Sequence, residues 1–508
     1  MPTILTTRAT ITLPNRPPML RRTAPAALAG LFAIGLAGCA VAPPYQAPHT
    51  TAPARYTATP LAHKTVNASG TAQQLTTGPA PAHWWRNFHS RSLDALIEKG
   101  FAQSPTLAAS RATLRQYDYL ARAAGAANFP SVGAGASGER QRAISQLTGQ
   151  PLTYDTFVGQ LNVSYNPDIF GALRYASDSA AAQAQAQRFE LQAAYQTLAG
   201  NITTTALQAA SYRAQTRAMQ AILDRQRRAL KLVKDKYRLG AAPYSDVLSQ
   251  RSTVASTEAS LAGLRQSLAT SRHLLATLTG QYPADLSTDL PRLGTLTLPT
   301  KIPVSLPSDL VQARPDVQAA EAALRATYAK YGLAYAQRFP SFALTAAFGR
   351  GAPTIADLGK STFNFWNIAL NASATLFDAG ALKDKSEAAK AAVAASAANY
   401  RSTVLQAFRQ VADGLRALDN DAAALKARKS ALADADAALK IVSNQYRLGG
   451  VDFQTLLTAQ TTASQARIAY VQALAQRYAD TAALYVALGG RAWPATDSSS
   501  STTPPSHS

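Results

Sequence analysis

Residues able to carry out catalysis are few in this 508-residue chain, and their spacing matches no catalytic pattern. The six histidines are scattered and lack the spacing of a zinc protease. There is no Gly-x-Ser-x-Gly turn for a nucleophile and no phosphate-binding loop. The charged motif Arg314-Pro315-Asp316 precedes an apolar periodic run and suits a helix start with Asp316 in the first turn. We therefore predict a protein that is not an enzyme and binds no cofactor or metal.

Cys39 is the only cysteine, which excludes disulfides within the chain and thiolate metal clusters. The apolar run 26–37, with arginines at 21–22 before it, has the layout of a signal peptide and is too short to span a membrane. Its end, Leu-Ala-Gly-Cys at 36–39, resembles the lipobox of bacterial lipoproteins. That resemblance implies cleavage before Cys39 and a covalent lipid on its sulfur. Because Ala40 rather than aspartate follows, it also implies sorting to the outer membrane.

The formal charge of +21 would by itself favour nucleic-acid binding. However, charged residues make up only 16% of the chain and include no dense run of lysine and arginine. The signal-peptide layout also directs the chain out of the cytoplasm. We therefore expect no nucleic-acid partner.

A long segment of the sequence occurs twice. KYRLGAAPYSDVL, at 236–248, returns as QYRLGGVDFQTLL at 445–457, and an earlier block from Ser104 aligns without gaps on one from Arg314. The repeated unit is far longer than those of solenoid proteins. We therefore predict this organisation: signal peptide 1–38 (with Met19 as an alternative start), lipid-anchored extended tether 39–83, first repeat 84–290, linker 291–307, second repeat 308–493 and disordered tail 494–508.

Each repeat contains one very long helical pattern. Residues 168–242 and 354–493 contain no proline, and apolar residues recur there in alternating steps of four and three, which is a heptad seam. The two helices could begin near Gly171 and Gly380 and end at the glycine of the repeated Tyr-Arg-Leu-Gly. About 65 residues would extend roughly 100 Å, which is too long for an ordinary globular core.

A second helical pattern follows each repeated glycine. Gly240 and Gly449 suit left-handed helix caps, and Ser245 or Asp246 could cap the helix that follows the first of them. We therefore predict that Tyr-Arg-Leu-Gly marks the tip of a hairpin of two long antiparallel helices in each repeat.

Strand patterns lie between the helices. TFNFWNIALNASATLF at 362–377 and TFVGQLNVSY at 156–165 alternate apolar and polar residues, and PSFALTAAFG and PSVGAGASG are weaker partners. Strands of about 9 to 11 residues can cross an outer membrane within a barrel. Four strands cannot close a barrel, and lipid does not tolerate an open edge, so several chains would have to contribute strands. The alternative is short hairpins packed on a soluble domain.

Over nearly the whole mature length, the chain resembles the outer membrane factors of tripartite efflux systems, the TolC/OprM-like family and its lipoprotein (NodT-like) branch. The resemblance is carried by these motifs: CAVAPPYQAP, WWRNFHSRSLDALI, NPDIFGALR, RPDVQAAEAALRA, RFPSFALTAAFG and the two Tyr-Arg-Leu-Gly tips. It implies a homotrimer whose twelve-stranded outer-membrane barrel continues into a helical tunnel across the periplasm. It also implies a periplasmic adaptor and an inner-membrane pump, of RND type, as partners in the export of small molecules.

The resemblance also assigns roles to the hairpin tips. The positions that match the adaptor-docking tips are Arg238, Leu239, Gly240, Arg447, Leu448 and Gly449. Tyr446 and Asp246, with Ser245 beside it, match a pair that helps to hold the closed pore. A tyrosine hydroxyl donating to a carboxylate makes a charge-assisted bond that can break on opening. The alternative for Asp246 is a plain N-terminal helix cap.

Two other functions remain open. Protein export by a type I secretion system uses the same fold, although the lipoprotein branch favours small molecules. A purely structural lipoprotein would bridge the membrane and the periplasm, but a spacer needs no amphipathic strands.

One departure from the family leads to a prediction. Relatives often carry an acidic ring at the pore constriction, whereas the matching positions here are Thr458 and, a turn earlier, Gln454. A neutral ring lacks the charge that holds divalent cations, so we expect weaker block by them than in acidic-ring relatives. Single-channel recordings with divalent cations on the periplasmic side would check this. Tight block in the millimolar range would contradict it.

Overall fold

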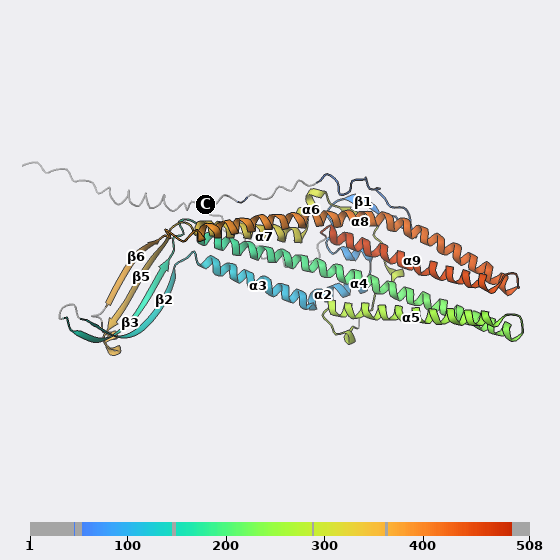
Figure 1. The fold of residues 1–508 in the computed structure, drawn as a ribbon. Coiled ribbons are helices and arrows are strands. Elements are labelled where there is room, and N and C mark those ends of the chain that lie inside the picture. Colours follow the sequence, from blue (N-terminus) through green and yellow to red (C-terminus); the bar gives the residue numbers. More distant parts are fainter. Residues whose placement is uncertain (1–44, 46–52, 145–148, 287–288, 361–363, 490–508) are drawn as a thin grey trace, which may run out of the picture. The chain divides into compact units, whose positions relative to one another are not determined.

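The computed structural model describes residues 45, 53–144, 149–286, 289–360 and 364–489 (Figure 1). They form two compact units. One unit contains residues 128–172 and 336–377, and the other contains the remaining described residues. Each unit draws on both halves of the sequence, because each repeat inserts a pair of strands between its helices.

The second unit is helical, and its helices occur in pairs of matching length. α3 (Pro105–Ala126) and α7 (Pro315–Ala336) have 22 residues each. α4 (Ala172–Arg238) and α8 (Ala381–Arg447) have 67 residues each, or about 100 Å. α5 (Tyr244–Leu278) and α9 (Phe453–Ala487) have 35 each. Two shorter helices, α2 (Arg91–Gln103) and α6 (Pro307–Ala313), complete the unit. The predicted limits of the long helices are confirmed, as is the helix start at the Arg314-Pro315-Asp316 motif.

The heptad seam is the buried side of the long helices. On α4, the seam residues Leu191, Tyr195, Leu198, Ile202 and Val233 are all buried. The first four join the main core with the aromatic side chains of the short helix η1 (Trp84–Phe88) and with residues of α8 and α9. On α8 the seam is also buried for most of its length, but Arg428 is exposed. None of the described helices has a segment of the length and hydropathy that crossing a membrane requires.

The N-terminal segment is fixed to the helical unit by a buried arginine. Arg477 of α9 is 1% exposed and donates hydrogen bonds to the carbonyl oxygens of Ala68 and Thr71 and to the side chains of Thr65 and Gln73, at 3.1 to 3.5 Å. Burial is the main reason why its pKa is lowered. The segment continues into β1 (Gln74–Thr77), which pairs in parallel with β4 (Lys301–Val304).

The first unit is a four-stranded antiparallel sheet of order β2-β3-β5-β6. Its strands are β2 (Ser131–Ile144), β3 (Pro151–Tyr165), β5 (Ser341–Ala352) and β6 (Asn364–Ser373). The two strands predicted in each repeat are confirmed. Their predicted length of about 9 to 11 residues is right only for β6, because the others have 14, 15 and 12 residues. The missed residues of the two longest strands are Glu139–Ile144 of β2, which are mostly polar, and Pro151–Asp155 of β3, whose apolar residues lie on the opposite face from those of the predicted part. The strand predicted up to Phe377 ends at Ser373.

The register gives the sheet two different faces. Paired residues share a face, so Trp366 lies with Phe348 and Leu161, and Ile368 lies with Ala346 and Val163. We call this the apolar face, and its large hydrophobic side chains are exposed: Val132, Leu161, Val163, Leu344, Phe348, Trp366, Ile368 and Leu370. The opposite, polar face carries, among others, Gln160, Asn162, Ser164, Thr345, Asn367 and Asn371. Within the described chain, the outer edges of β2 and β6 pair with no strand.

Two left-handed glycines provide a matched test of the fold. Gly240 and Gly280 have φ of +72° and +71°, but only at Gly280 would a Cβ collide with a backbone carbonyl, that of Gln103. We expect Gly240→Ala to cost about 1 kcal/mol from backbone strain alone, and Gly280→Ala at least about 3 kcal/mol. Urea unfolding of the full chain would measure both values. Equal losses would contradict the packing role of Gly280.

Candidate functional site at the hairpin tips

Both hairpins turn through the same hydrogen-bonded motif at their tips. At the first tip, the amide of Gly240 donates to the carbonyl of Tyr237 at 2.9 Å and that of Ala241 to Lys236 at 2.8 Å. At the second, the amides of Gly449 and Gly450 make the equivalent bonds at 3.2 and 2.9 Å. This is the Schellman motif, which requires a left-handed residue and therefore favours glycine. The predicted hairpin tips are confirmed.

The starts of the two returning helices differ. The N-cap of α5 is Pro243, with no side-chain hydrogen bond, so the prediction that Ser245 or Asp246 caps this helix is wrong. Asp246 lies in the first turn, where a carboxylate is favoured by the helix dipole. The second hairpin does have a cap, because Asp452 accepts a hydrogen bond of 2.8 Å from the amide of Thr455. The helix begins directly after Pro243, so Ser245 and Asp246 already lie inside its first turn and cannot act as the cap.

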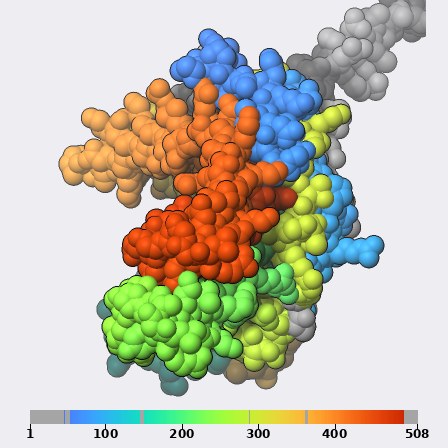
Figure 2. Space-filling view, turned by 90° about the vertical axis from the view of Figure 1, so that its right-hand side faces the viewer, coloured from blue at the N-terminus to red at the C-terminus, as the bar shows by residue number. Residues whose placement is uncertain are grey.

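A small apolar cluster joins the four long helices near the tips. It contains Val233 of α4, Val247 of α5, Tyr446 of α8, and Phe453 and Leu456 of α9. Figure 2 views these helix ends and shows the α8–α9 hairpin, in orange and red, directly against the α4–α5 hairpin, in green. The two hairpins of one chain are therefore held together at their tips by apolar contact.

Lys236 adds a polar link between the same two hairpins. Its ammonium nitrogen donates to the carbonyl oxygen of Tyr446 at 3.1 Å and lies 4.0 Å from the centre of the Tyr446 ring. A cation over an aromatic face is attracted by the ring quadrupole. The sequence analysis missed this residue, although its position directly before Tyr237, where the second repeat has Gln445, is a difference between the two tips.

Tyr446 and Asp246 lie near each other without a direct bond. The pKa of the 5% exposed Tyr446 is raised by burial first and then by the negative charge of Asp246, so its hydroxyl remains a donor at neutral pH. The pKa of Asp246 is also raised, by partial burial and then by the charge of Asp452. Among the described hydrogen bonds, none joins the Tyr446 hydroxyl to the Asp246 carboxylate. The structure thus brings the two predicted gate residues close together, and the predicted hydrogen bond between them stays a prediction.

The remaining predicted residues are exposed at the tips. Leu239 and Leu448, at 79% and 86% exposure, project apolar side chains beside exposed arginines. Arg238 pairs with Asp235 at 3.1 Å, and Arg447 donates to Asn444. Each tip is therefore an apolar point within a polar rim, which is the usual composition of a small protein contact.

Three more predicted site residues lie near the start of the returning helices. Ser245, Gln454 and Thr458 are exposed, and the Thr458 hydroxyl donates to the Gln454 carbonyl one turn earlier at 2.9 Å. Both α9 residues are thus neutral and face away from the chain's own core. Cys39 lies outside the described residues.

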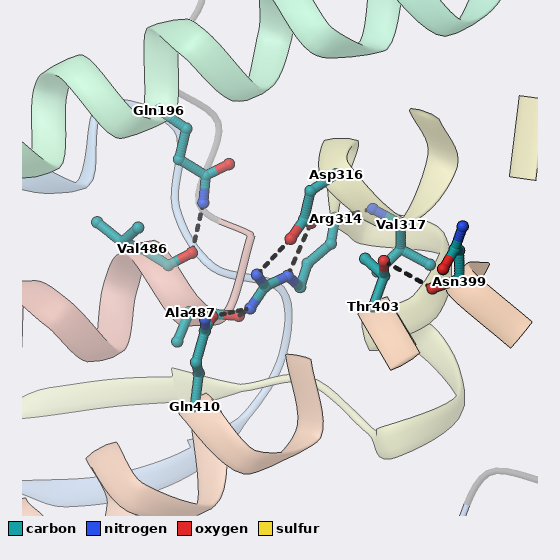
Figure 3. A network of polar contacts seen from close by, with 9 residues as sticks. All are labelled: Gln196, Arg314, Asp316, Val317, Asn399, Thr403, Gln410, Val486 and Ala487. Atoms are coloured by element: carbon teal, nitrogen blue, oxygen red, sulfur yellow. Dashed lines mark hydrogen bonds and ion pairs between the residues drawn. The ribbon is translucent and has the colours of Figure 1, made fainter. Parts of the chain in front are cut away.

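A second polar network, which the sequence analysis did not predict, lies far along the helices from the tips. Arg314 donates to the Asp316 carboxylate at 3.0 and 2.6 Å, and to both the Gln410 side chain and the Ala487 carbonyl at 2.9 Å (Figure 3). It therefore ties the start of α7 to α8 and to the last turn of α9, where a cation is favoured. Nearby, Gln196 of α4 donates to another carbonyl of the same turn, that of Val486.

The family comparison matches both repeats. A sequence profile described as "Outer membrane efflux protein" matches residues 96–281 and again residues 306–490. Together the two matches cover well over half of the chain.

Individual relatives match almost end to end. The pyoverdine export outer membrane protein OpmQ of Pseudomonas putida is 31% identical over 414 residues, which cover 80% of this chain and 87% of OpmQ. The antibiotic efflux pump outer membrane protein ArpC of Pseudomonas putida is 29% identical over 466 residues, 90% of this chain and 93% of ArpC. The solved outer-membrane channel OprN is 26% identical, has a TM-score of 0.83 and matches 90% of this chain with its full length. The chain therefore belongs to the outer membrane efflux protein family.

Proposed function

We propose that the protein forms, as a homotrimer, the outer-membrane channel of a tripartite efflux pump. Small molecules would reach it from an inner-membrane pump, of RND type, through a periplasmic adaptor. The observation that carries the proposal is the sheet with one apolar face, one polar face and two unpaired edges. It is joined in sequence to helices of about 100 Å, a length that suits a periplasmic duct.

The sheet requires partner strands if it lies in lipid. Its outer edges expose backbone N–H and C=O groups, and each such group left unpaired in a hydrocarbon layer costs several kcal/mol. A closed ring of antiparallel strands removes both edges. Three copies of the four-stranded sheet would give the twelve strands that the family resemblance implies, with the apolar faces toward lipid and the polar faces toward the lumen.

The hairpin tips are the proposed contact with the adaptor. Each chain exposes two leucine side chains, Leu239 and Leu448, one at each tip. The neighbouring residues Arg238 and Arg447 are also exposed. The two tips of each chain share one backbone motif, so a trimer would present six similar tips to the adaptor. We propose that Tyr446, Asp246 and Ser245 form the periplasmic gate there, and that Gln454 and Thr458 line its constriction.

The exported compounds are proposed to be small molecules. OpmQ is named for pyoverdine export and ArpC for antibiotic efflux, so relatives of similar length serve different small molecules. We further propose that a covalent lipid on Cys39 anchors the N-terminus in the outer membrane. This proposal rests on the lipobox-like sequence alone.

Planar-bilayer recordings test both the channel and its gate. We expect the purified wild-type trimer to show a small closed-state conductance. Asp246→Ala combined with Tyr446→Phe should raise that conductance severalfold, because the change removes the carboxylate and the hydroxyl of the proposed gate bond. Thr277→Ala, a change at an exposed position at the opposite end of α5 from the tip, serves as a control. An unchanged conductance in the double variant would remove the gate assignment, and no conductance from folded trimer would refute the channel.

The Lys236 link gives a separate prediction about the closed tip. Lys236→Met keeps the aliphatic stem but removes the bond to the Tyr446 carbonyl and the charge over the ring, a loss of about 1 to 2 kcal/mol. We expect Lys236→Met to have a higher closed-state conductance than the wild type. At high salt, where charge interactions are screened, the two proteins should differ less. Lys234→Met changes an exposed lysine two residues away and should leave the conductance as it is. If both variants behave alike, the link does not hold the tip.

A further inference from the structure

The charged residues of the sheet gather at one end of it. The four strands contain five charged side chains: Glu139, Arg140, Arg142, Asp155 and Arg350. All five lie toward the strand ends that are joined by the β2–β3 and β5–β6 connections. The other ends, which continue in sequence toward the helices, carry no charged residue within the strands. The two rims of the apolar face are therefore chemically different.

The register places three arginines on the apolar face itself. Arg350 follows Phe348 by two residues on β5, so both side chains point to the same side. On β2, Arg140 and Arg142 share the face of Val132, because they follow it by eight and ten residues and alternate residues of a strand point to the same side. Glu139 lies on the opposite, polar face. The arginines thus border the exposed hydrophobic side chains rather than the lumen.

An aromatic group separates the hydrophobic centre from the arginines. Phe348 and Trp366 are paired across β5 and β6 and are 58% and 74% exposed. Aromatic residues at this position are typical of the level at which a membrane barrel meets lipid headgroups. The next residue on the same face of β5 is Arg350. If the sheet lies in the outer membrane as proposed, the Arg350 guanidinium would lie one step beyond the hydrocarbon boundary, at the level of the headgroups.

The three guanidinium groups remain available to a ligand. Arg350 is oriented by its Nε bond of 3.0 Å to the Asn364 side chain and its Nη1 bond of 3.4 Å to the Gly359 carbonyl. Arg140 pairs at 3.6 Å with Asp155, and its side chain is 77% exposed. Arg142 is exposed and forms no ion pair with another described residue. The negative charge of Asp155 offsets only one of the three arginines, so this rim of the apolar face carries a net positive charge.

We propose that Arg140, Arg142 and Arg350 form a binding surface for phosphate groups of lipids in the outer leaflet. Arginine suits this ligand because its planar fork donates two parallel hydrogen bonds to phosphate oxygens. Arg140 and Arg350 stand four residues apart in register, about 14 Å along the strands, so they form a row rather than one pocket. A row fits large headgroups that carry more than one phosphate. The inference rests on the proposed function, because lipid surrounds the apolar face only if the sheet lies in the outer membrane.

Lipid retention by the purified trimer tests the inference. The full-length protein in nonionic detergent is mixed with diphosphorylated lipid A or with the same lipid after removal of its phosphates, and bound lipids are counted by native mass spectrometry. We expect the wild type to retain the phosphorylated form at least tenfold better, and Arg140→Gln, Arg142→Gln, Arg350→Gln together to abolish that preference. The corresponding triple lysine variant keeps the charge and should retain part of it.

A matched control removes the same charge elsewhere. Arg228→Gln, Lys231→Gln and Lys234→Gln change three exposed residues of α4 and should leave the lipid preference intact. Equal retention of both lipids by the wild type, or an unchanged preference in the arginine-to-glutamine variant, would overturn the inference. Conductance in bilayers free of lipid A separates the two proposals: if the wild type conducts, a lost lipid preference counts against the arginine surface alone. Absence of any conductance would count against the channel.

Discussion

The unpaired edges of β2 and β6 are the constraint on which the rest of the structure depends. A four-stranded sheet that is hydrophobic on one face and open at both edges cannot be stable alone, in water or in lipid. Every other large feature is consistent with an assembled protein. The long helices bury only one side against their own chain, and many of their remaining side chains are exposed. These features agree with the proposed assembly, in which each chain supplies one part of a closed ring.

The tips show how one motif, used twice, can serve two different hairpins. The backbone turns are alike because the Schellman motif depends only on a left-handed glycine and two hydrogen bonds donated by backbone N–H groups. The side chains are not alike. The second hairpin has a capped helix start at Asp452, whereas the first starts at Pro243 without a side-chain cap and supplies Lys236 as the link to Tyr446. The first hairpin thus lacks a side-chain cap, but it is bonded to the second hairpin through Lys236.

Patterns with a period were predictable from the sequence, and single contacts were not. Heptad spacing and the repeated glycines located α4, α5, α8 and α9, and alternation located the centres of the strands. The end of β2 was missed because Glu139–Ile144 is mostly polar, and the start of β3 was missed because its apolar residues Leu152 and Tyr154 lie on the polar face. The roles of Arg314 and Lys236 depend on partners 96 and 210 residues away in sequence, which no local pattern contains. The cap at Asp246 failed because proline set the helix start first.

The hydrogen bonds of Arg477 also limit how far the N-terminus can be shortened. The acceptors of its guanidinium come from Thr65, Ala68, Thr71 and Gln73, so they are supplied by the segment directly before β1. A mature chain trimmed up to residue 60 would keep every one of them. A chain that began after Gln73 would remove all four acceptors of this guanidinium, and leaving its buried N–H groups without those partners would cost several kcal/mol. The segment from Thr65 to Gln73 is thus part of the folded helical unit, and a shortened form of the protein should begin before Thr65.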